Sequence, residues 1–276
     1  MQQTLSVEVF LAVITAVFLF AWYKYEKLVR LDIQNNRIDY NFIMQMNQVQ
    51  ISIIIPTLNE AESIAAVLEA IPGNVAAEIL VVDGGSKDGT VAIAKSAGAT
   101  VINEPRGGYG QACATGLAAA QAEIVVFLDG DGADDPRYLL ELALPILENQ
   151  ADMVLGSRLL GQIDPGAMPW HQRFGNWLAA FLIRALYGLP LTDLSPFRAV
   201  RREALLKLGM SEMTYGWPTE MIVKAALLGW RIREIPVAYH PRCGGKSKIS
   251  GTLKGTVLAT GFILGTILRV ARERTT

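Results

Sequence analysis

From residue 50 onward, short runs of apolar residues alternate with longer segments in which apolar residues recur every three or four positions. Continuous apolar runs predict buried strands, and the longer period predicts amphipathic helices. Strands and helices that alternate in this way indicate an α/β fold, a mostly parallel sheet with helices on both faces. The predicted strands are 51–55, 78–83, 100–102, 123–129 and 152–157, and the predicted helices are 61–71, 88–98, 110–122 and 136–147.

A second pattern, an uninterrupted apolar run, occurs near the start of the chain. Residues 9–23 carry no charge, and the run extended from Leu5 to Tyr25 nearly spans the roughly 30 Å core of a bilayer. Basic residues follow this run and none precedes it. The positive-inside tendency therefore predicts a single-pass transmembrane helix with the rest of the chain on the cytoplasmic face. The alternative is a start of translation downstream of this run.

Another apolar run, residues 255–268, lies near the C-terminus and is short for spanning a bilayer. Because Lys254 and Arg269 flank it, we expect an amphipathic or interfacial, membrane-associated helix, with a buried core helix as the alternative. Residues 26–49 show no clear period. The predicted division is a transmembrane anchor at 1–25, a linker at 26–49, a main domain at 50–250 and a C-terminal membrane helix at 251–276.

Charge and cysteine content exclude some classes of protein. The 276 residues carry a formal net charge of −1, so the chain lacks the basic surface that binds nucleic acid. Cys113 and Cys243 are the two cysteines of the chain. This number predicts neither a disulfide framework nor a zinc site, and it fits a reducing compartment.

Four aspartates stand within seven positions at the end of the predicted strand 123–129, in VVFLDGDGADDP. Asp134 and Asp135 precede a proline and fit the N-terminal cap of a helix. Asp129 and Asp131 flank a glycine directly after the strand, where two carboxylates repel each other unless a cation lies between them. Mg²⁺ and Mn²⁺ bind carboxylate oxygens, so this pair predicts a metal site, with a solvated turn as the alternative.

Two other predicted strands also end in polar residues. PTLNE at 56–60 follows the first strand, and DGGS at 83–86 follows the second. The carboxyl ends of parallel strands meet at one edge of a sheet, and ligands bind beyond that edge. Three polar strand ends at one edge therefore predict a binding site.

The order of these motifs resembles the family 2 glycosyltransferases with a GT-A fold. The shared motifs are SIIIPTLNEAESI, VVDGGSKDGT, the D-x-D at Asp129–Asp131 and GSR at 156–158. Three later segments resemble the dolichyl- and polyprenyl-phosphate sugar transferases: DLSPFRAV at 193–200, TEMIVKAALLGWRIREIPV at 219–237 and RCGGKSK at 242–248. The resemblance covers residues 50 to about 255, and the order and spacing of the motifs are more specific than any one of them.

The resemblance implies a fold that binds a nucleotide-diphosphate sugar, UDP- or GDP-linked, and an inverting transfer of the sugar to a polyprenyl or dolichyl phosphate at the membrane. It also implies roles for single residues. Pro56, Thr57 and Glu60 would line the nucleoside pocket, and Asp83 would bond the base; Asp129 and Asp131 would hold Mg²⁺ or Mn²⁺; Arg242, Ser247 and Lys248 would close over the diphosphate; Arg158 and Arg173 would bind the lipid phosphate.

The sequence departs from the family at two positions. Many members carry a glutamine as a third metal ligand where this chain has Ala133, so Asp134, a water or the diphosphate must complete the metal shell. The second motif usually has two adjacent aspartates, and here the second is Gly84. The identity of the sugar does not follow from the resemblance.

A phosphate acceptor fits the small number of histidines. A hydroxyl acceptor needs a general base, and we interpret His171 and His240 as structural. A phosphate, with a second pKa of about 6, is already ionised at neutral pH and needs arginines to position it. Glu220 is a further candidate, as a sugar contact or an acid–base group, with a helix cap as the alternative.

Two glycine-containing segments complete the prediction. Residues 106–116 (RGGYGQACATG) lack the spacing of a dinucleotide fingerprint and predict a tight turn into a helix near a phosphate. Residues 242–248 combine glycines with basic residues and predict a flexible lid. The alternative function is sugar transfer to a hydroxyl of a soluble or glycolipid acceptor.

Overall fold

The structure is a computed structural model that describes residues 50–73, 76–244 and 253–273, all within one compact unit, Gln48–Thr276. The predicted anchor at 1–25 and linker at 26–49 lie outside the described residues. Within the three described ranges, no helix combines the length and the apolar content needed to cross a bilayer.

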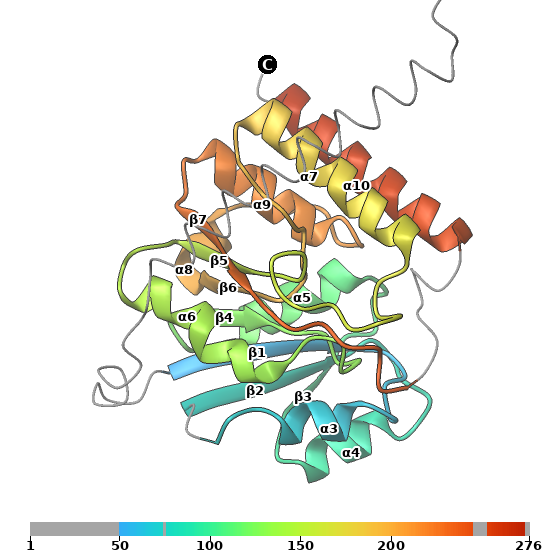
Figure 1. Ribbon diagram of the computed structural model, residues 1–276. Helices are drawn as coiled ribbons and strands as arrows, with labels where there is room; N and C mark the ends of the chain where they lie inside the picture. Colours follow the sequence, from blue (N-terminus) through green and yellow to red (C-terminus); the bar gives the residue numbers. More distant parts are fainter. Residues whose placement is uncertain (1–49, 74–75, 245–252, 274–276) are drawn as a thin grey trace, which may run out of the picture. The chain divides into compact units, whose positions relative to one another are not determined.

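A seven-stranded sheet forms the centre of the fold, in the order β3-β2-β1-β4-β6-β5-β7 (Figure 1). The strands are β1 Gln50–Thr57, β2 Ala76–Asp83, β3 Thr100–Asn103, β4 Ile124–Phe127, β5 Met153–Ser157, β6 Arg198–Arg201 and β7 Ile232–Pro236. Strand β6 pairs antiparallel with β4 and β5, and the other pairs are parallel. The predicted mostly parallel sheet is confirmed; the antiparallel β6 was not predicted.

Helices cover both faces of this sheet. They are α3 Ile64–Glu69, α4 Thr90–Ser96, α5 Tyr109–Ala119, α6 Leu139–Leu147 after the 3-10 turn Pro136–Tyr138, α7 Trp170–Tyr187, α8 Arg202–Lys207, α9 Trp217–Leu227 and α10 Leu253–Glu273. Side chains of α3, α4 and α6 form the core on one face, and those of α5, α7, α8, α9 and α10 form the core on the other. The helices predicted up to residue 147 are confirmed, with ends that differ by a few residues.

Strand β1 shows why the apolar run 51–55 predicts a strand buried on both sides. Ile53 and Ile55 belong to the core under α3, α4 and α6, whereas Ile54 belongs to the core under α5 and α9. All three are fully buried. Successive side chains of a strand point to opposite faces, so a strand between two helix layers must be apolar at every position.

The sheet brings the polar strand ends together as the sequence predicts. The backbone N–H of Gly84 donates to the carbonyl of Thr57 at 2.9 Å, and that of Leu128 donates to the carbonyl of Ile54 at 3.1 Å. These bonds continue the pairing of β1 with β2 and β4 beyond the strands. The segments that follow the three strands therefore start from one edge.

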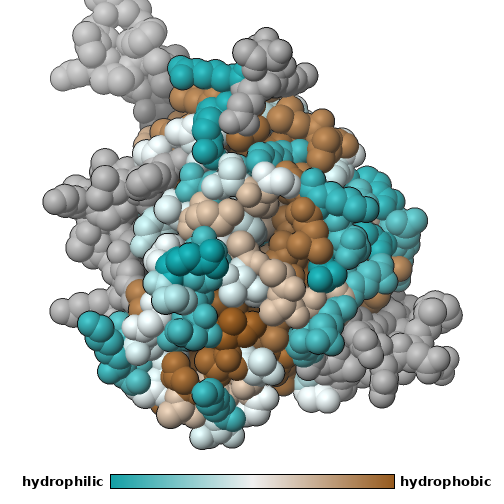
Figure 2. Space-filling model, turned by 180° about the vertical axis from the view of Figure 1, so that it is seen from behind, coloured by the Kyte–Doolittle hydropathy of each residue, from teal (hydrophilic) through white to brown (hydrophobic). Residues whose placement is uncertain are grey.

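Helices α7 and α10 lie side by side (Figure 1). The Tyr187 hydroxyl donates to the carbonyl of Ile267 at 2.5 Å, and Ile267 and Val270 are buried. One side of α10 therefore packs into the fold, as the core-helix alternative requires, while Leu268 is 48% exposed. Seen from behind, apolar brown surface gathers in separate patches, one of them near the top, at the height of α7 and α10 (Figure 2).

Candidate active site

A cavity of about 400 Å³ opens at the carboxyl ends of β1, β2 and β4. The strand ends contribute Pro56, Thr57, Leu58, Glu60, Gly84, Asp129, Gly130 and Asp131 to its lining. Helix α7, α10 and the loops between elements contribute others, including Gln172, Asn176, Tyr215 and Ile263. The cavity thus extends from the strand ends to the helix pair α7 and α10.

Asp129 and Asp131 project from the turn that follows β4. The Tyr109 hydroxyl donates to Asp129 Oδ1 at 3.0 Å, and the N–H of Ala133 donates to Asp131 Oδ1 at 2.9 Å. Desolvation, and next the charge of Asp131, raise the pKa of Asp129 to about 7. The pair therefore carries a repulsion that a cation in the cavity would relieve.

Arg242 supplies a positive charge at this point. Its Nη1 donates to Asp131 Oδ2 at 2.7 Å, and its Nη2 lies 3.0 Å from both carboxylate oxygens of Glu60. Glycine at position 132 permits this approach, because its φ is +76° and a Cβ there would lie 2.5 Å from Cys243 Sγ. Ser247 and Lys248, predicted to act with Arg242, lie outside the described residues.

The nucleoside residues predicted from the first two strand ends lie close together. Pro56, Thr57 and Glu60 line the cavity. Asp83 is buried beside it, and its Oδ2 accepts from the N–H groups of Gly85 and Ser86 at 3.0 Å each. Its Oδ1 is buried and has no hydrogen-bond partner among the described residues. That oxygen can accept a donor brought by a ligand.

Arg158 directly follows strand β5 and also lines the cavity, but its guanidinium is already engaged. Nε and Nη2 bind the two carboxylate oxygens of Asp193 at 2.8 and 2.7 Å, and the ring of Tyr239 lies 5.0 Å from Cζ. Although burial opposes it, the charge of Asp193 raises the pKa of Arg158. Glu234 fixes this arrangement, since its carboxylate accepts from the N–H groups of Thr192 and Asp193 at 2.9–3.0 Å.

Two predicted residues do not reach the cavity. Arg173 is exposed on α7 and is absent from the cavity lining. Glu220 is buried in the first turn of α9, where its carboxylate accepts from the N–H groups of Ser211 and Glu212 and pairs with Lys224 at 3.1 Å. These contacts favour the structural alternative for Glu220, which holds the loop before α9.

The chain matches the family described as Glycosyl transferase family 2 over residues 52–209. It belongs to this family. It is 43% identical over 209 residues to an uncharacterized glycosyltransferase of Mycobacterium tuberculosis, which covers 76% of this chain and 94% of that one. It is 33% identical over 216 residues to a dolichyl-phosphate hexose transferase of Haloferax volcanii (77% and 92% covered), and 31% identical over 222 residues to an undecaprenyl-phosphate mannosyltransferase of Micrococcus luteus (73% and 88% covered).

A solved structure resembles this glycosyltransferase in fold. It is glucosyl-3-phosphoglycerate synthase from Mycobacterium tuberculosis in complex with Mn²⁺, UDP and phosphoglyceric acid. The TM-score is 0.69 at 24% sequence identity, and the match covers 86% of this chain and 84% of that one. The likeness confirms the GT-A-like α/β fold.

Several residues of the glycosyltransferase cavity were missed by sequence reasoning. Tyr109 and Tyr239 line the cavity, where they contact Asp129 and Arg158, and Asp193 binds Arg158 from outside the lining. For Tyr109 a signal existed, since residues 106–116 were expected to form a turn near a phosphate, and Gly107, Gly108 and Tyr109 do line the cavity. Asp193 lies in a motif that carried the resemblance.

The acidic residues can supply some of the ligands of a divalent cation, and phosphate oxygens of a bound molecule would supply others. No group of three or more His, Cys, Asp or Glu side chains in the described ranges is arranged to hold a metal ion by itself. Asp134, expected to be a helix cap, is instead buried near Asp129, and its Oδ1 has no hydrogen-bond partner among these residues. Asp135 is the cap, since its side chain accepts from the N–H of Arg137. Carboxylates with open positions suit Mg²⁺ or Mn²⁺ that also binds phosphate oxygens.

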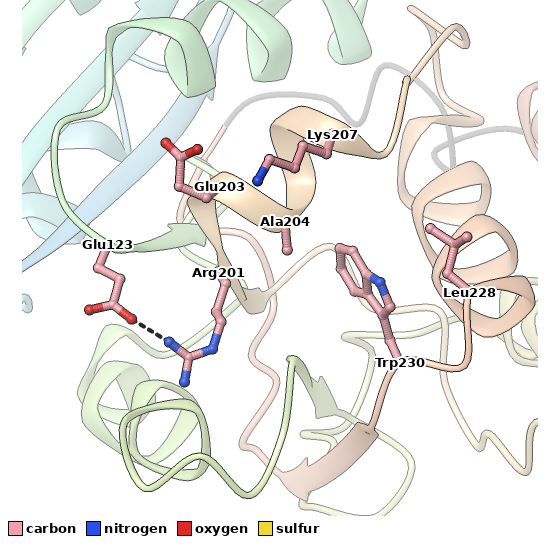
Figure 3. Close-up of a pocket in the computed structure, with 7 residues that line it drawn as sticks. All are labelled: Glu123, Arg201, Glu203, Ala204, Lys207, Leu228 and Trp230. Atoms are coloured by element: carbon pink, nitrogen blue, oxygen red, sulfur yellow. Dashed lines mark hydrogen bonds and ion pairs between the residues drawn. The ribbon is translucent and has the colours of Figure 1, made fainter.

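A second cavity, of about 530 Å³, lies at the other edge of the sheet (Figure 3). Glu123 and Arg201 lie at the start of β4 and the end of β6, and they form an ion pair with each other. Figure 3 shows Lys207, Leu228 and Trp230 around the same space. Ligands of parallel sheets bind beyond the carboxyl ends of the strands, so this cavity is not the candidate active site.

Proposed function

We propose that this glycosyltransferase moves a sugar from a nucleotide-diphosphate donor to a polyprenyl phosphate at a membrane surface. The observation that carries the proposal is the composition of the cavity. Acidic and basic groups suited to a diphosphate line it, the buried Arg158 is part of the same lining, and neither His171 nor His240 is. A phosphate acceptor needs no general base, whereas a hydroxyl acceptor does.

The donor end provides groups for each part of a nucleotide sugar. Pro56 and Thr57 would pack against the nucleoside, and the buried Oδ1 of Asp83 would accept from the base. A solved structure of the same fold, glucosyl-3-phosphoglycerate synthase, contains UDP and Mn²⁺, which supports this assignment. Either UDP or GDP fits these contacts.

Charge at the donor end would favour departure of the diphosphate. Asp129 and Asp131 would hold Mg²⁺ or Mn²⁺, which when bound stabilises negative charge on the leaving group. Arg242 would turn from Asp131 and Glu60 toward the diphosphate, because a phosphate accepts its planar fork. The ion pair with Glu60 would keep Arg242 beside the cavity when no donor is bound.

The acceptor end would position a phosphate rather than deprotonate a hydroxyl. Arg158 uses Nε and Nη2 for Asp193, which leaves the Nη1 side of its fork for a phosphate oxygen. The names of two relatives, a dolichyl-phosphate hexose transferase and an undecaprenyl-phosphate mannosyltransferase, support a polyprenyl-phosphate acceptor.

The alternative is transfer to a hydroxyl of a soluble or glycolipid acceptor. One observation favours it: a structural neighbour was solved with phosphoglyceric acid.

The test incubates the purified full chain with labelled UDP- and GDP-sugars, polyprenyl phosphate and Mn²⁺ or Mg²⁺. We expect label to enter the organic extract with one donor, and EDTA to remove that incorporation. Failure of every donor to label the lipid, together with transfer to a soluble acceptor, would replace this proposal by the alternative.

A further inference from the structure

Helix α7 carries exposed aromatic side chains along one side. Trp170, Phe174 and Phe181 are 76%, 56% and 47% exposed. The ring of Trp177 lies between the last two, with centroids 5.8 Å from each. Spacings of four, seven and eleven residues put all four on one side of an α-helix. We call these four residues the aromatic side of α7.

The opposite side of the same helix lines the candidate active site. It contributes Gln172, Gly175, Asn176 and Ala179 to the cavity. By helical periodicity these four residues lie about half a turn away from the aromatic side. Helix α7 therefore separates the cavity from whatever contacts the aromatic side. A helix with its side chains is about 10–12 Å across, so a surface in contact with the aromatic side lies within that distance of the cavity.

The charges of α7 point to the kind of surface that it meets. Its 18 residues include Arg173 and Arg184 but no Asp or Glu, in a chain whose net charge is −1. Both arginines are exposed, and helical periodicity puts them at one border of the aromatic side. Tryptophan and phenylalanine bordered by arginine are typical of helices that lie in the headgroup region of a bilayer.

We propose that Trp170 and Phe174, on the aromatic side of α7, lie in the headgroup region of a lipid bilayer with anionic lipids. The purpose of this contact rests on the proposed function, because a polyprenyl-phosphate acceptor must reach the cavity from the bilayer. A bilayer offers an apolar region for Trp170 and Phe174 and phosphates for Arg173 at the same place. Such a contact needs no helix that spans the membrane.

The first test measures lipid contact at α7 itself, using the purified full chain. Vesicles of phosphatidylcholine and phosphatidylglycerol, with and without brominated acyl chains, quench tryptophans that lie in the bilayer. We expect Trp170→Phe to lower the quenching that the brominated vesicles cause, while Trp22 in the predicted anchor and Trp177 on the same side of α7 account for the rest. Trp230→Phe, at the opposite edge of the sheet, is the control and should keep it. Equal quenching in the wild type and Trp170→Phe overturns the proposal.

The second test separates lipid contact from chemistry. Phe174→Glu should lower transfer to polyprenyl phosphate in vesicles about tenfold, and leave transfer to a short-chain acceptor in detergent within about twofold, because only the first needs the bilayer. Leu228→Glu is the matched control, since Leu228 is 65% exposed beside the second cavity and should affect neither assay. Equal losses of Phe174→Glu in both assays overturn the proposal.

The two proposals can fail separately. A wild-type protein that transfers no sugar to either lipid acceptor, yet loses part of its quenching in Trp170→Phe, contradicts the proposed function and supports the lipid contact. A wild-type protein that transfers sugar but shows no quenching at Trp170, and whose Phe174→Glu variant elutes as a smaller species, overturns the lipid contact in favour of a second copy of this chain.

Discussion

At the scale of single residues, the acidic cluster after β4 is held by groups from distant parts of the chain. Tyr109 comes from the start of α5 and Arg242 from the segment after β7, and both bind this cluster at 2.7–3.0 Å. Each carboxylate therefore has a defined orientation before a ligand binds. Pre-set orientation of charged groups is a main source of catalytic stabilisation in enzyme sites.

We expect Asp131→Asn to abolish sugar transfer without unfolding the protein. The change removes the charge that binds Arg242 and that would hold a divalent cation, a loss of several kcal/mol of transition-state stabilisation, or about a thousandfold in rate. Steady-state kinetics and a thermal melt measure the two effects. Asp135→Asn is the control, because Asp135 caps the next turn and does not line the cavity. Transfer by Asp131→Asn at near wild-type rate contradicts the role.

Arg158→Lys tests the buried ion pair at the acceptor end. Lysine keeps the charge but cannot form the two bonds to Asp193, so the group that faces the cavity loses its orientation. We expect the acceptor KM to rise about tenfold, whereas nucleotide affinity measured by calorimetry changes less than about twofold. Arg233→Lys, at an exposed position of β7 outside the cavity lining, is the control. A loss of nucleotide affinity equal to the loss of acceptor affinity in Arg158→Lys would show that the residue serves the donor instead.

Local sequence identified some of these residues and not others for a physical reason. Asp129 and Asp131 can be recognised from the sequence because two charged residues directly after a buried strand are unusual. The contacts of Tyr109, Asp193 and Tyr239 depend on which loops the sheet order brings together. That order includes the antiparallel β6, which the periodicity of residues 198–201 does not reveal.

At the scale of elements, helix α5 packs on the sheet through a position where no side chain fits. A Cβ at Gly116 would lie 2.4 Å from Ile54 Cγ2 and 3.1 Å from Val82 Cγ2. Because no side chain separates α5 from the sheet at this position, the helix packs closely on the strands. This close packing fixes the position of the segment that precedes the helix. That segment includes Gly108 and Tyr109 at the rim of the cavity. Packing of α5 therefore positions the group that binds Asp129.

The same substitution should have opposite effects in two helices. Gly116→Ala is expected to lower the free energy of unfolding by about 1–3 kcal/mol, because overpacking outweighs the gain in helix propensity. Gly265→Ala in α10 meets nothing within 4 Å, so we expect a gain of up to about 1 kcal/mol. Urea denaturation of both variants checks the signs. Stabilisation by Gly116→Ala would contradict the close approach of α5 to β1.

Glu104 stabilises the loop between β3 and α5 through hydrogen bonds and an ion pair. Its carboxylate accepts from Nε of Arg106 at 2.8 Å and from the Thr115 hydroxyl. Hydrogen bonds from Arg106, and next from Thr115, lower the pKa of Glu104 from 4.5 to about 2. Because the folded-state pKa is the lower one, this stabilisation is complete above about pH 4.5 and is lost as the pH falls toward 2.

Glu104→Gln should therefore lower the melting temperature at pH 7, and its difference from the wild type should shrink between pH 5 and pH 2. Thermal melts across this range measure the change. Glu69→Gln, at an exposed position of α3, is the matched control. A difference that stays constant down to pH 2 would mean that the ion pair of Glu104 contributes nothing to the fold.

Strands and helices up to residue 157 follow from periodicity, since buried strands and amphipathic helices leave distinct patterns. Helix α7 shows the limit of this approach. Aromatic residues usually face the core, and only the fold shows that Trp170 and Phe174 are exposed while Gln172 and Asn176 line the cavity. The flanking charges of α10 predict an amphipathic or interfacial helix, but they do not reveal which side packs into the fold; the structure shows that Ile267 and Val270 are buried and Leu268 is exposed.

At the scale of the whole described unit, different elements form the two ends of the cavity. The ends of β1, β2 and β4 carry the groups suited to a nucleotide diphosphate, and α7 and α10 border the other end. Under the proposed function, the strand ends would bind the water-soluble donor, and the lipid acceptor would enter beside α7 and α10. The central claim is therefore that the acceptor is a lipid phosphate.

The most direct test compares three acceptors with the purified full chain and one labelled donor: polyprenyl phosphate, the polyprenol of the same length, and 3-phosphoglycerate. We predict label in lipid with the phosphate alone, in a product that releases the sugar and polyprenyl phosphate on mild acid treatment. Label in polyprenol or in 3-phosphoglycerate at an equal or higher rate, with none in polyprenyl phosphate, would contradict the account.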